Sequence, residues 1–298
     1  MIDTSDYLPA RCFAAGESLS PEMRAAFDAD GYLLLEDFVP AEECDRLRAR
    51  ALDLVAAFDP AEHRTVFSTT SVAHAAAEYF ESSGDKIRFF FEEGAFDAAG
   101  NLRQDKALSI NKIGHAMHDL DPVFDGFSRT GRLRALAAGL GFRQPLLLQS
   151  MYIFKQPRIG GEVGWHQDAS FFVTTPHTVT TFWFALEDAT LDNGCLWVKP
   201  GAQHDALREQ YVCDHARGTL AMQPLDRTPW PARADSVPLP VAAGTLVVFG
   251  GLLPHCSEAN RSGRSRLAYT LHATCGSAAY APENWLQRSA ALPVRGFD

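Results

Sequence analysis

The stretch LLLQSMYIF at residues 146–154 marks the change from helical to β patterning on which the fold depends. Similar short runs, rich in β-branched, aromatic or aliphatic residues, occupy residues 146–154, 179–186, 195–198, 219–222, 244–249 and 264–273. Gly, Pro, Asn and Asp separate these runs, as they commonly separate neighbouring β-strands. The pattern predicts a mainly β protein with helices packed on one side, whose core is either a barrel or a jelly roll.

The residues before this stretch follow helical patterns around a single strand. Ser20 and Pro21 are a typical N-cap and first residue of a helix that should end near Gly31. A short strand over residues 32–35 follows. A second helix begins at Pro40, and another spans residues 132–140. We therefore expect one domain over residues 1–298, with a helical part at about 1–144 and a jelly-roll core at about 145–275. The irregular residues 59–100 are the best candidate for a mobile lid.

Composition argues against several classes of function. The chain has 298 residues and a formal charge of −10, so it lacks the basic surface that nucleic acids or anionic membranes require. No apolar run reaches the roughly 18 residues of a spanning helix. The start, Met1-Ile2-Asp3, has no secretory signal. The six scattered cysteines contain no CxxC pair and indicate reduced thiols rather than a disulfide framework or a zinc site. We expect a soluble cytoplasmic protein that binds neither nucleic acid nor membrane.

The segment GWHQD at residues 164–168 carries the main chemical signal. Residues two apart in a strand share a face, so His166 and Asp168 could bind one metal ion together. Alone, such a pair is more often a surface hydrogen bond. His255 follows the apolar run GTLVVFG at residues 244–250, and a jelly roll could bring it beside His166. Two histidines and a carboxylate are the ligands of iron(II) oxygenases, although His255 could instead only satisfy hydrogen bonds at a strand end.

The polar turn NRSGRSR at residues 260–266 leads into the last of the predicted strands. An arginine there could hold a carboxylate through two hydrogen bonds, while the other end of a 2-oxo dicarboxylic acid chelates the metal. Arg264 and Arg266 share strand parity, so periodicity does not choose between them. A solvated basic turn is the alternative interpretation.

With His166, Asp168, His255 and Arg266 in this order, the chain resembles the phytanoyl-CoA dioxygenase family through nearly its whole length. The segments that carry the resemblance most specifically are residues 83–92, 111–115, 149–157, 160–163, 166–171, 187–190, 193–197 and 282–287. Matches this long are far more specific than a two-residue motif.

The resemblance implies a double-stranded β-helix that binds iron through His166, Asp168 and His255. It also implies that two residues, Arg266 and Ser257, hold the far carboxylate of 2-oxoglutarate. By the same matching, the co-substrate pocket is lined by Lys112, Met151 and Trp183. Elsewhere, His115 and His118 are three residues apart and would share one face of a helix, but we interpret both as ordinary polar positions.

We predict an Fe(II)- and 2-oxoglutarate-dependent dioxygenase that uses dioxygen to hydroxylate a small organic substrate, with release of succinate and CO2. The alternatives are a cupin-like metal-dependent hydrolase or isomerase and a non-catalytic metal-binding module, neither of which needs Arg266 beside the metal. Residues 78–97 carry six acidic side chains against only Lys86 and Arg88. Since coenzyme A phosphates favour clustered basic residues, we expect the substrate not to be a long-chain acyl-CoA.

Overall fold

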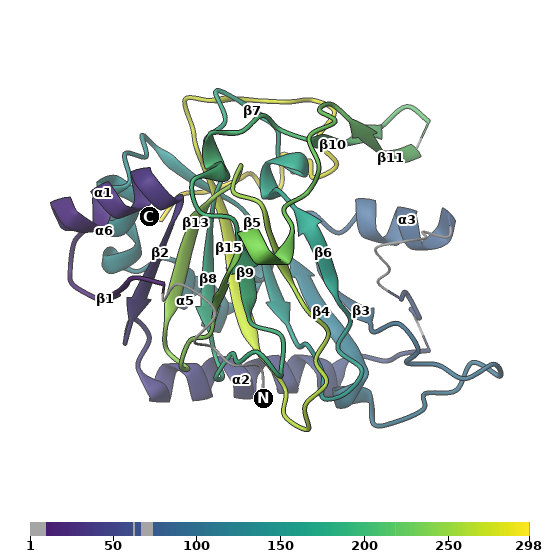
Figure 1. Cartoon of the computed structure of the whole chain (residues 1–298). Helices are drawn as coiled ribbons and strands as arrows, with labels where there is room; N and C mark the ends of the chain where they lie inside the picture. Colours follow the sequence, from purple (N-terminus) through teal and green to yellow (C-terminus); the bar gives the residue numbers. More distant parts are fainter. Residues whose placement is uncertain (1–9, 62, 67–73, 218, 298) are drawn as a thin grey trace.

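Two β-sheets that face each other form the centre of the structure (Figure 1), which is a computed structural model describing residues 10–61, 63–66, 74–217 and 219–297. The large sheet has the strand order β1-β2-β13-β8-β15-β5-β4-β3, and the small sheet has the order β12-β9-β14-β6. Apolar side chains from both sheets meet in one buried cluster. This arrangement is a double-stranded β-helix, so the predicted fold class is confirmed.

The large sheet contains β1 (Cys12–Ala14), β2 (Tyr32–Glu36), β3 (Ile87–Phe91), β4 (Ile110–His115), β5 (Pro145–Ile153), β8 (Thr180–Ala185), β13 (Leu246–Gly250) and β15 (Ala268–Cys275). The small sheet contains β6 (Val163–His166), β9 (Leu196–Val198), β12 (Val237–Leu239) and β14 (His255–Ser257). Two further pairs are β10 (Glu209–Asp214) with β11 (Thr219–Pro224) and β7 (Thr174–Thr175) with β16 (Ala279–Tyr280). Neighbouring strands are antiparallel, except for the parallel pair β1 and β2.

The α-helices are α1 (Pro21–Asp30), α2 (Ala41–Ala57), α3 (His74–Glu81), α4 (Met117–Leu120), α5 (Pro122–Ser128) and α6 (Gly131–Gly139). The short 3-10 helices are η2 (Lys106–Leu108), η3 (Asp168–Ser170), η4 (Ala202–His204) and η5 (Arg233–Asp235). Helix α1 begins and ends where the sequence predicts, because Ser20 Oγ accepts from the Met23 amide and Gly31 adopts a left-handed φ of 83°. In Figure 1, α1 and α6 lie beside each other at one edge of the large sheet, and α3 lies towards the other.

The N-terminal part contains the expected helices but more strands than expected. Within the described residues it supplies four strands of the large sheet, β1 to β4, where the sequence predicts one. Strand β4 reads INKIGH, and its polar Lys112 faces the interior of the protein instead of solvent, so the usual apolar alternation is broken. Strand β3 reads IRFFF, and its Phe89 and Phe91 pack in the main core, whereas Phe90 between them faces the same interior space as Lys112. Residues 62 and 67–73 of the predicted lid lie outside the described residues.

One face of the large sheet packs in the main core, and the other face lines a cavity. On β8, Phe182 and Phe184 point towards the helices and join the main core, which also contains Leu47 of α2. The alternate residues Thr181 and Trp183 point towards the small sheet and line a cavity. The same alternation holds along β5 and β15, because successive side chains of a strand point to opposite faces.

Among the described residues, no helix combines the length and apolar character that crossing a lipid bilayer demands. The six cysteines are all free thiols.

Candidate active site

One cavity of about 950 Å³ lies between the two sheets. Its wall includes every residue that the sequence predicts for the site, namely Lys112, Met151, His166, Asp168, Trp183, His255, Ser257 and Arg266. They come from both sheets, from the 3-10 helix η3 after β6 and from the loop before β15. Residues up to 154 positions apart in sequence are therefore brought to one place by the fold.

His166, Asp168 and His255 face one another at the small sheet. His255 begins β14 and pairs directly with His166, the last residue of β6, so the ring centroids are 4.1 Å apart. Oδ1 of Asp168 lies 3.6 Å from Nε2 of His166 and 3.7 Å from Nε2 of His255. One ligand atom from each residue lies within 4.8 Å of the other two, so the three residues could hold one metal ion.

The sequence predicts that His166 and Asp168 lie in one strand, and this is only half correct. Strand β6 ends at His166, and Asp168 is the first residue of the 3-10 helix η3. The shared face survives because Gln167 between them keeps an extended backbone, with φ −120° and ψ 128°. The Gln167 side chain points away from the triad and donates to the Leu252 carbonyl.

Backbone carbonyls orient both histidine rings. Nδ1 of His166 lies 2.9 Å from the Gly164 carbonyl, and Nδ1 of His255 lies 3.0 Å from the Leu253 carbonyl. A neutral ring in this position donates from Nδ1, which leaves the Nε2 lone pair free for a metal ion. Burial, together with the nearby His166, lowers the pKa of His255 to about 4, so His255 is neutral at pH 7.

The second oxygen of Asp168 has its own partners, which sequence reasoning missed. Oδ2 accepts a hydrogen bond of 2.5 Å from Thr181 and lies 3.3 Å from Nε2 of His272, whose Nδ1 in turn lies 3.2 Å from Gln149 Nε2. Burial acts to raise the pKa of Asp168, but His255, His272 and His166 outweigh it and lower the pKa well below its ordinary value. Thr181, His272 and Gln149 are polar residues inside predicted apolar strands, and that contrast is the signal that could have identified them.

Arg266 and Arg264 have opposite surroundings. Arg266 is 2% exposed, with its guanidinium carbon 5.3 Å from the centroid of the Trp183 ring, whereas Arg264 is exposed. Within the described part of the chain, neither Nε nor Nη1 of Arg266 has a hydrogen-bond partner. Burial lowers its pKa to about 10, so it is charged at neutral pH. Both arginines precede β15, which begins at Ala268 and not at residue 264 as predicted.

Lys112 and Met151 lie on neighbouring strands of the large sheet, on its cavity face. Nζ of Lys112 lies 5.6 Å from the centroid of the Phe80 ring and 5.7 Å from that of Phe90. Burial lowers the pKa of Lys112 to about 7. Ser257 contributes to the wall from β14, two residues after His255.

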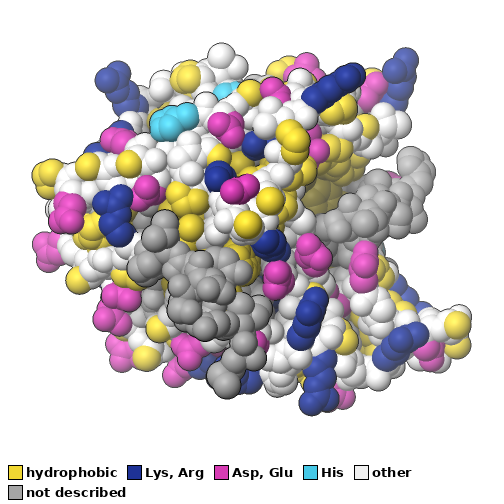
Figure 2. Space-filling view, viewed as in Figure 1, with side chains coloured by type: hydrophobic (Ala, Val, Ile, Leu, Met, Phe, Trp, Pro, Cys, Tyr) yellow, Lys and Arg dark blue, Asp and Glu magenta, His cyan; other side chains and the backbone are white. Residues whose placement is uncertain are grey.

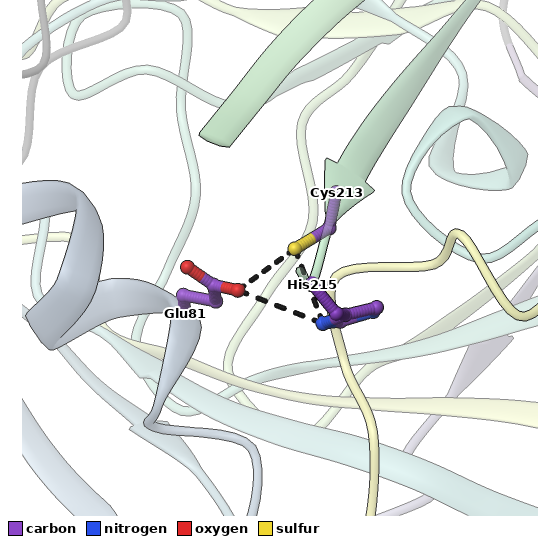
Figure 3. Close-up of side chains that lie close together, drawn as sticks. All are labelled: Glu81, Cys213 and His215. Carbon is purple, nitrogen blue, oxygen red and sulfur yellow. Dashed lines mark hydrogen bonds and ion pairs between the residues drawn. The ribbon is translucent and has the colours of Figure 1, made fainter. Parts of the chain in front are cut away.

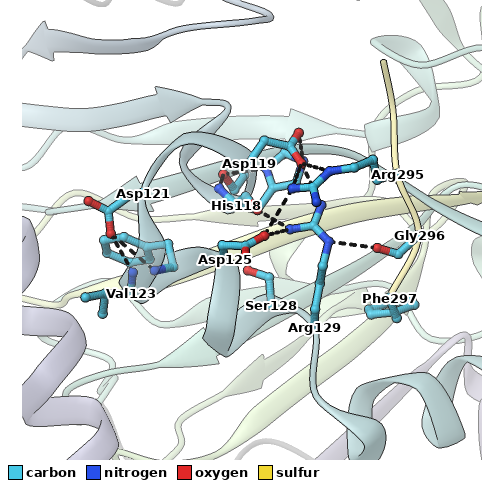
Figure 4. A network of polar contacts seen from close by, with 12 residues as sticks. His118, Asp119, Asp121, Val123, Asp125, Ser128, Arg129, Arg295, Gly296 and Phe297 are labelled. Carbon is cyan, nitrogen blue, oxygen red and sulfur yellow. Dashed lines mark hydrogen bonds and ion pairs between the residues drawn. The ribbon is translucent and has the colours of Figure 1, made fainter. Parts of the chain in front are cut away.

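His115 and His118 do not share a helix face, because His115 ends β4 and His118 lies in α4. His115 lines the cavity and has Nδ1 2.7 Å from Ser83 Oγ. His118 belongs to a buried ion-pair network around Asp119, shown in Figure 4 with Arg129 and Arg295. Burial lowers the pKa of His118 to about 3, so it is a neutral member of that network.

A double-stranded β-helix with a His-Asp-His triad that could bind iron defines a class, the non-haem iron oxygenases. The model of the family described as phytanoyl-CoA dioxygenase (PhyH) matches residues 27–268, and the chain belongs to this family.

Relatives of similar length share this membership. The chain is 45% identical over 282 residues to phytanoyl-CoA dioxygenase domain-containing protein 1 of Bos taurus, covering 92% of this chain and 97% of the relative. It is 43% identical over 273 residues to phytanoyl-CoA dioxygenase of Arabidopsis thaliana, covering 91% and 95%. The resemblance seen in the sequence is thus confirmed.

Solved structures share the fold. The non-haem α-ketoglutarate-dependent carbocyclase SnoK from nogalamycin biosynthesis matches with a TM-score of 0.63 and 17% identity, over 96% of this chain and 100% of SnoK. EctD from S. alaskensis, solved with 2-oxoglutarate and 5-hydroxyectoine, matches with a TM-score of 0.62 and 23% identity, over 99% and 93%. Family and fold together indicate an oxygenase-type enzyme of the non-haem iron and 2-oxoglutarate class.

Proposed function

We propose that the protein is an Fe(II)- and 2-oxoglutarate-dependent dioxygenase that hydroxylates a small organic substrate. The observation that supports this most strongly is a combination within one cavity. Three ligand atoms of His166, Asp168 and His255 face one another, and the buried Arg266 keeps two nitrogen atoms without a partner in the described residues. Such nitrogens are costly to bury unless a ligand meets them.

The donor set fits iron. Two imidazole nitrogens and one carboxylate oxygen are the facial triad of non-haem Fe(II) oxygenases, which leaves the remaining coordination positions for co-substrates. When bound, the iron supplies the activation of dioxygen and the oxidising power of the reaction. The chain fixes the ligands, because carbonyls orient both histidine rings while Thr181 and His272 hold the outer oxygen of Asp168.

Arg266 would bind the far carboxylate of 2-oxoglutarate. Its planar guanidinium offers parallel donors that match a carboxylate, and its position against Trp183 keeps the fork in the cavity. Ser257, Lys112, Met151 and Trp183 would form the rest of the co-substrate pocket. Apolar side chains make up much of the remaining cavity wall and would limit access of water during turnover.

A small substrate suits this site better than a long-chain acyl-CoA. The basic residues of the 78–97 segment are engaged, because Lys86 pairs with Asp85 at 2.7 Å and Arg88 donates to Ser82 Oγ. Figure 2 shows Lys and Arg interspersed with Asp and Glu on the visible face, with hydrophobic side chains gathered in a hollow. Neither feature offers the basic cluster that several phosphate groups favour.

We also propose a cytoplasmic setting. All six cysteines are free although four of them are buried, and free thiols are typical of reducing compartments.

The proposal is tested by supplying purified protein with Fe(II), 2-oxoglutarate and dioxygen and measuring succinate. We expect slow formation of succinate without added substrate, and its loss in Asp168→Ala, which removes the only anionic ligand of the triad. Asp192→Ala, an exposed aspartate, is the matched control and should keep the parent rate. A hydrolase or isomerase would form no succinate, and an Asp168→Ala variant with parent activity would refute the ligand assignment.

A further inference from the structure

A second group of metal-ligating side chains lies outside the cavity wall and consists of Glu81, Cys213 and His215 (Figure 3). Glu81 is the last residue of α3, Cys213 lies in β10, and His215 follows that strand. Sγ of Cys213 lies 2.8 Å from Oε1 of Glu81 and 3.3 Å from Nδ1 of His215, and the last two atoms are 3.6 Å apart. The three ligand atoms thus form a small triangle.

The triangle has the dimensions of one face of a tetrahedral metal site. Bonds of about 2.0–2.3 Å, as zinc makes to nitrogen, oxygen and sulfur, give tetrahedron edges of about 3.3–3.8 Å. The two edges that end at Nδ1 of His215 fall in this range. The third edge, from Cys213 Sγ to Glu81 Oε1, is shorter because it is at present an S–H···O hydrogen bond. A metal ion would need only a shift of the Glu81 carboxylate by about half an ångström, well within side-chain freedom.

The other nitrogen of His215 is already occupied. Nε2 lies 3.1 Å from the carbonyl oxygen of Asn284, so a neutral ring donates there and directs the Nδ1 lone pair at Cys213 and Glu81. This carbonyl–histidine arrangement is the support that metal-bound histidines usually have. It is an observation independent of the three ligand atoms themselves.

We propose that Glu81, Cys213 and His215 form a second metal site, distinct from the iron triad, for a borderline-soft divalent cation of the zinc type. A sulfur, an imidazole and a carboxylate match the ligand preferences of zinc, whereas the iron triad contains no sulfur. The His215 side chain is 39% exposed, so water reaches the fourth position. Burial, followed by the neighbouring Glu81, raises the pKa of Cys213 to about 12, which agrees with a protonated thiol in the metal-free protein.

The site would join three segments behind the cavity wall. Phe80, next to Glu81, and Tyr211 of β10 both line the cavity and have ring centroids 6.4 Å apart. The Cys213 amide also donates to the Glu283 carbonyl of the C-terminal segment. A bound ion would therefore hold the end of α3 against β10 and the C-terminal segment, and fix the aromatic part of the wall.

Cobalt(II) tests the proposal, because thiolate-to-cobalt charge transfer absorbs in the near ultraviolet and the iron triad cannot produce it. The full chain is stripped with a chelator and titrated with Co(II). We expect the band to reach its maximum with one thiolate-bound cobalt per chain and to disappear when Zn(II) is added. Cys213→Ser should abolish the band, whereas Cys12→Ser (exposed) and Cys256→Ser (beside the iron triad) should retain it.

Glu81→Gln and His215→Asn protect the test against misfolding of the Cys213 variant, since both keep the thiol. Each should weaken cobalt binding about tenfold or more, while succinate formation dependent on Fe(II) continues. Absence of the band in the parent, its survival in Cys213→Ser, or unchanged cobalt affinity in both Glu81→Gln and His215→Asn would overturn the second site. None of these outcomes bears on the iron centre, so the two proposals fail separately.

Discussion

Arg266 differs from Arg264 in burial, and the two arginines therefore allow a matched comparison. Arg266→Ala should raise the apparent KM for 2-oxoglutarate about ten- to a hundredfold, because a charge-assisted hydrogen-bonded pair is worth about 1.5–3 kcal/mol. Arg264→Ala removes an exposed side chain and should leave the KM near the parent value. The KM of each variant is measured from the rate of succinate formation at increasing 2-oxoglutarate concentrations. Equal effects of the two substitutions would contradict the assignment of Arg266.

Thr181 is expected to act by positioning Asp168. Thr181→Val keeps the shape of the side chain but removes the hydrogen bond to Oδ2 of Asp168, and should weaken Fe(II) binding about ten- to a hundredfold. Thr180→Val makes the same change at the neighbouring residue, whose side chain points to the other face of β8. Calorimetric titration with Fe(II) under anaerobic conditions measures the Fe(II) affinity of the two variants. Identical affinities for the two variants would show that the Thr181 hydroxyl plays no part in metal binding.

The identities of the candidate ligands could be predicted from sequence, but not the residues around them. His166 and Asp168 form a local motif, and His255 follows an apolar run, so both signals are local in sequence. Thr181 and His272 reach Asp168 only because β8 and β15 are neighbours in the large sheet. That pairing depends on the whole topology, which short-range patterns do not contain.

Helix α2 shows at the level of an element how one face supports the fold. Leu47 is fully buried against the main core, and Leu47→Ala should lower the free energy of unfolding by about 2–5 kcal/mol. Leu52 lies on the same helix but is 47% exposed, so Leu52→Ala should cost less than about 0.5 kcal/mol. The free energies of unfolding of the two variants are compared by urea denaturation, monitored by circular dichroism. Similar losses from both variants would mean that α2 does not pack as described.

Elements with local start and stop signals could be predicted, and elements without them could not. Helix α1 has Ser20 as its cap and Gly31 at its end, and both signals are present in the sequence. Strands β6 (VGWH) and β14 (HCS) have only four and three residues, too few for an alternating pattern to be recognised. Strand β4 includes the buried Lys112, which no hydrophobic pattern marks as interior. The cavity strands with long apolar runs, such as β5 and β8, could therefore be predicted, whereas the short β6 and β14 and the interrupted β4 could not.

The charge of the whole molecule bears on the substrate. With a net charge of −10, the protein repels anionic ligands at long range, and on the face shown in Figure 2 Lys and Arg are interspersed with Asp and Glu. We expect phytanoyl-CoA and straight-chain acyl-CoAs to leave succinate formation at its substrate-free rate. The assay is succinate release with product analysis by mass spectrometry, with free phytanic acid as the control that lacks the phosphates. A hydroxylated acyl-CoA formed well above background would contradict this prediction.

The alternation along the large sheet bears on how enzymes of this architecture can diversify. On β8, Thr181 and Trp183 face the cavity, while Phe182 and Phe184 between them pack under the helices. A substitution at a cavity-facing residue changes the shape available to a substrate without disturbing the core behind the sheet. Selection for a new substrate could thus act on every second residue of a strand while stability is maintained by the others. Directed evolution of this protein should accordingly randomise cavity-facing residues with no assigned part in binding the metal or the co-substrate, such as Ile153 and Thr270, and leave the intervening residues fixed.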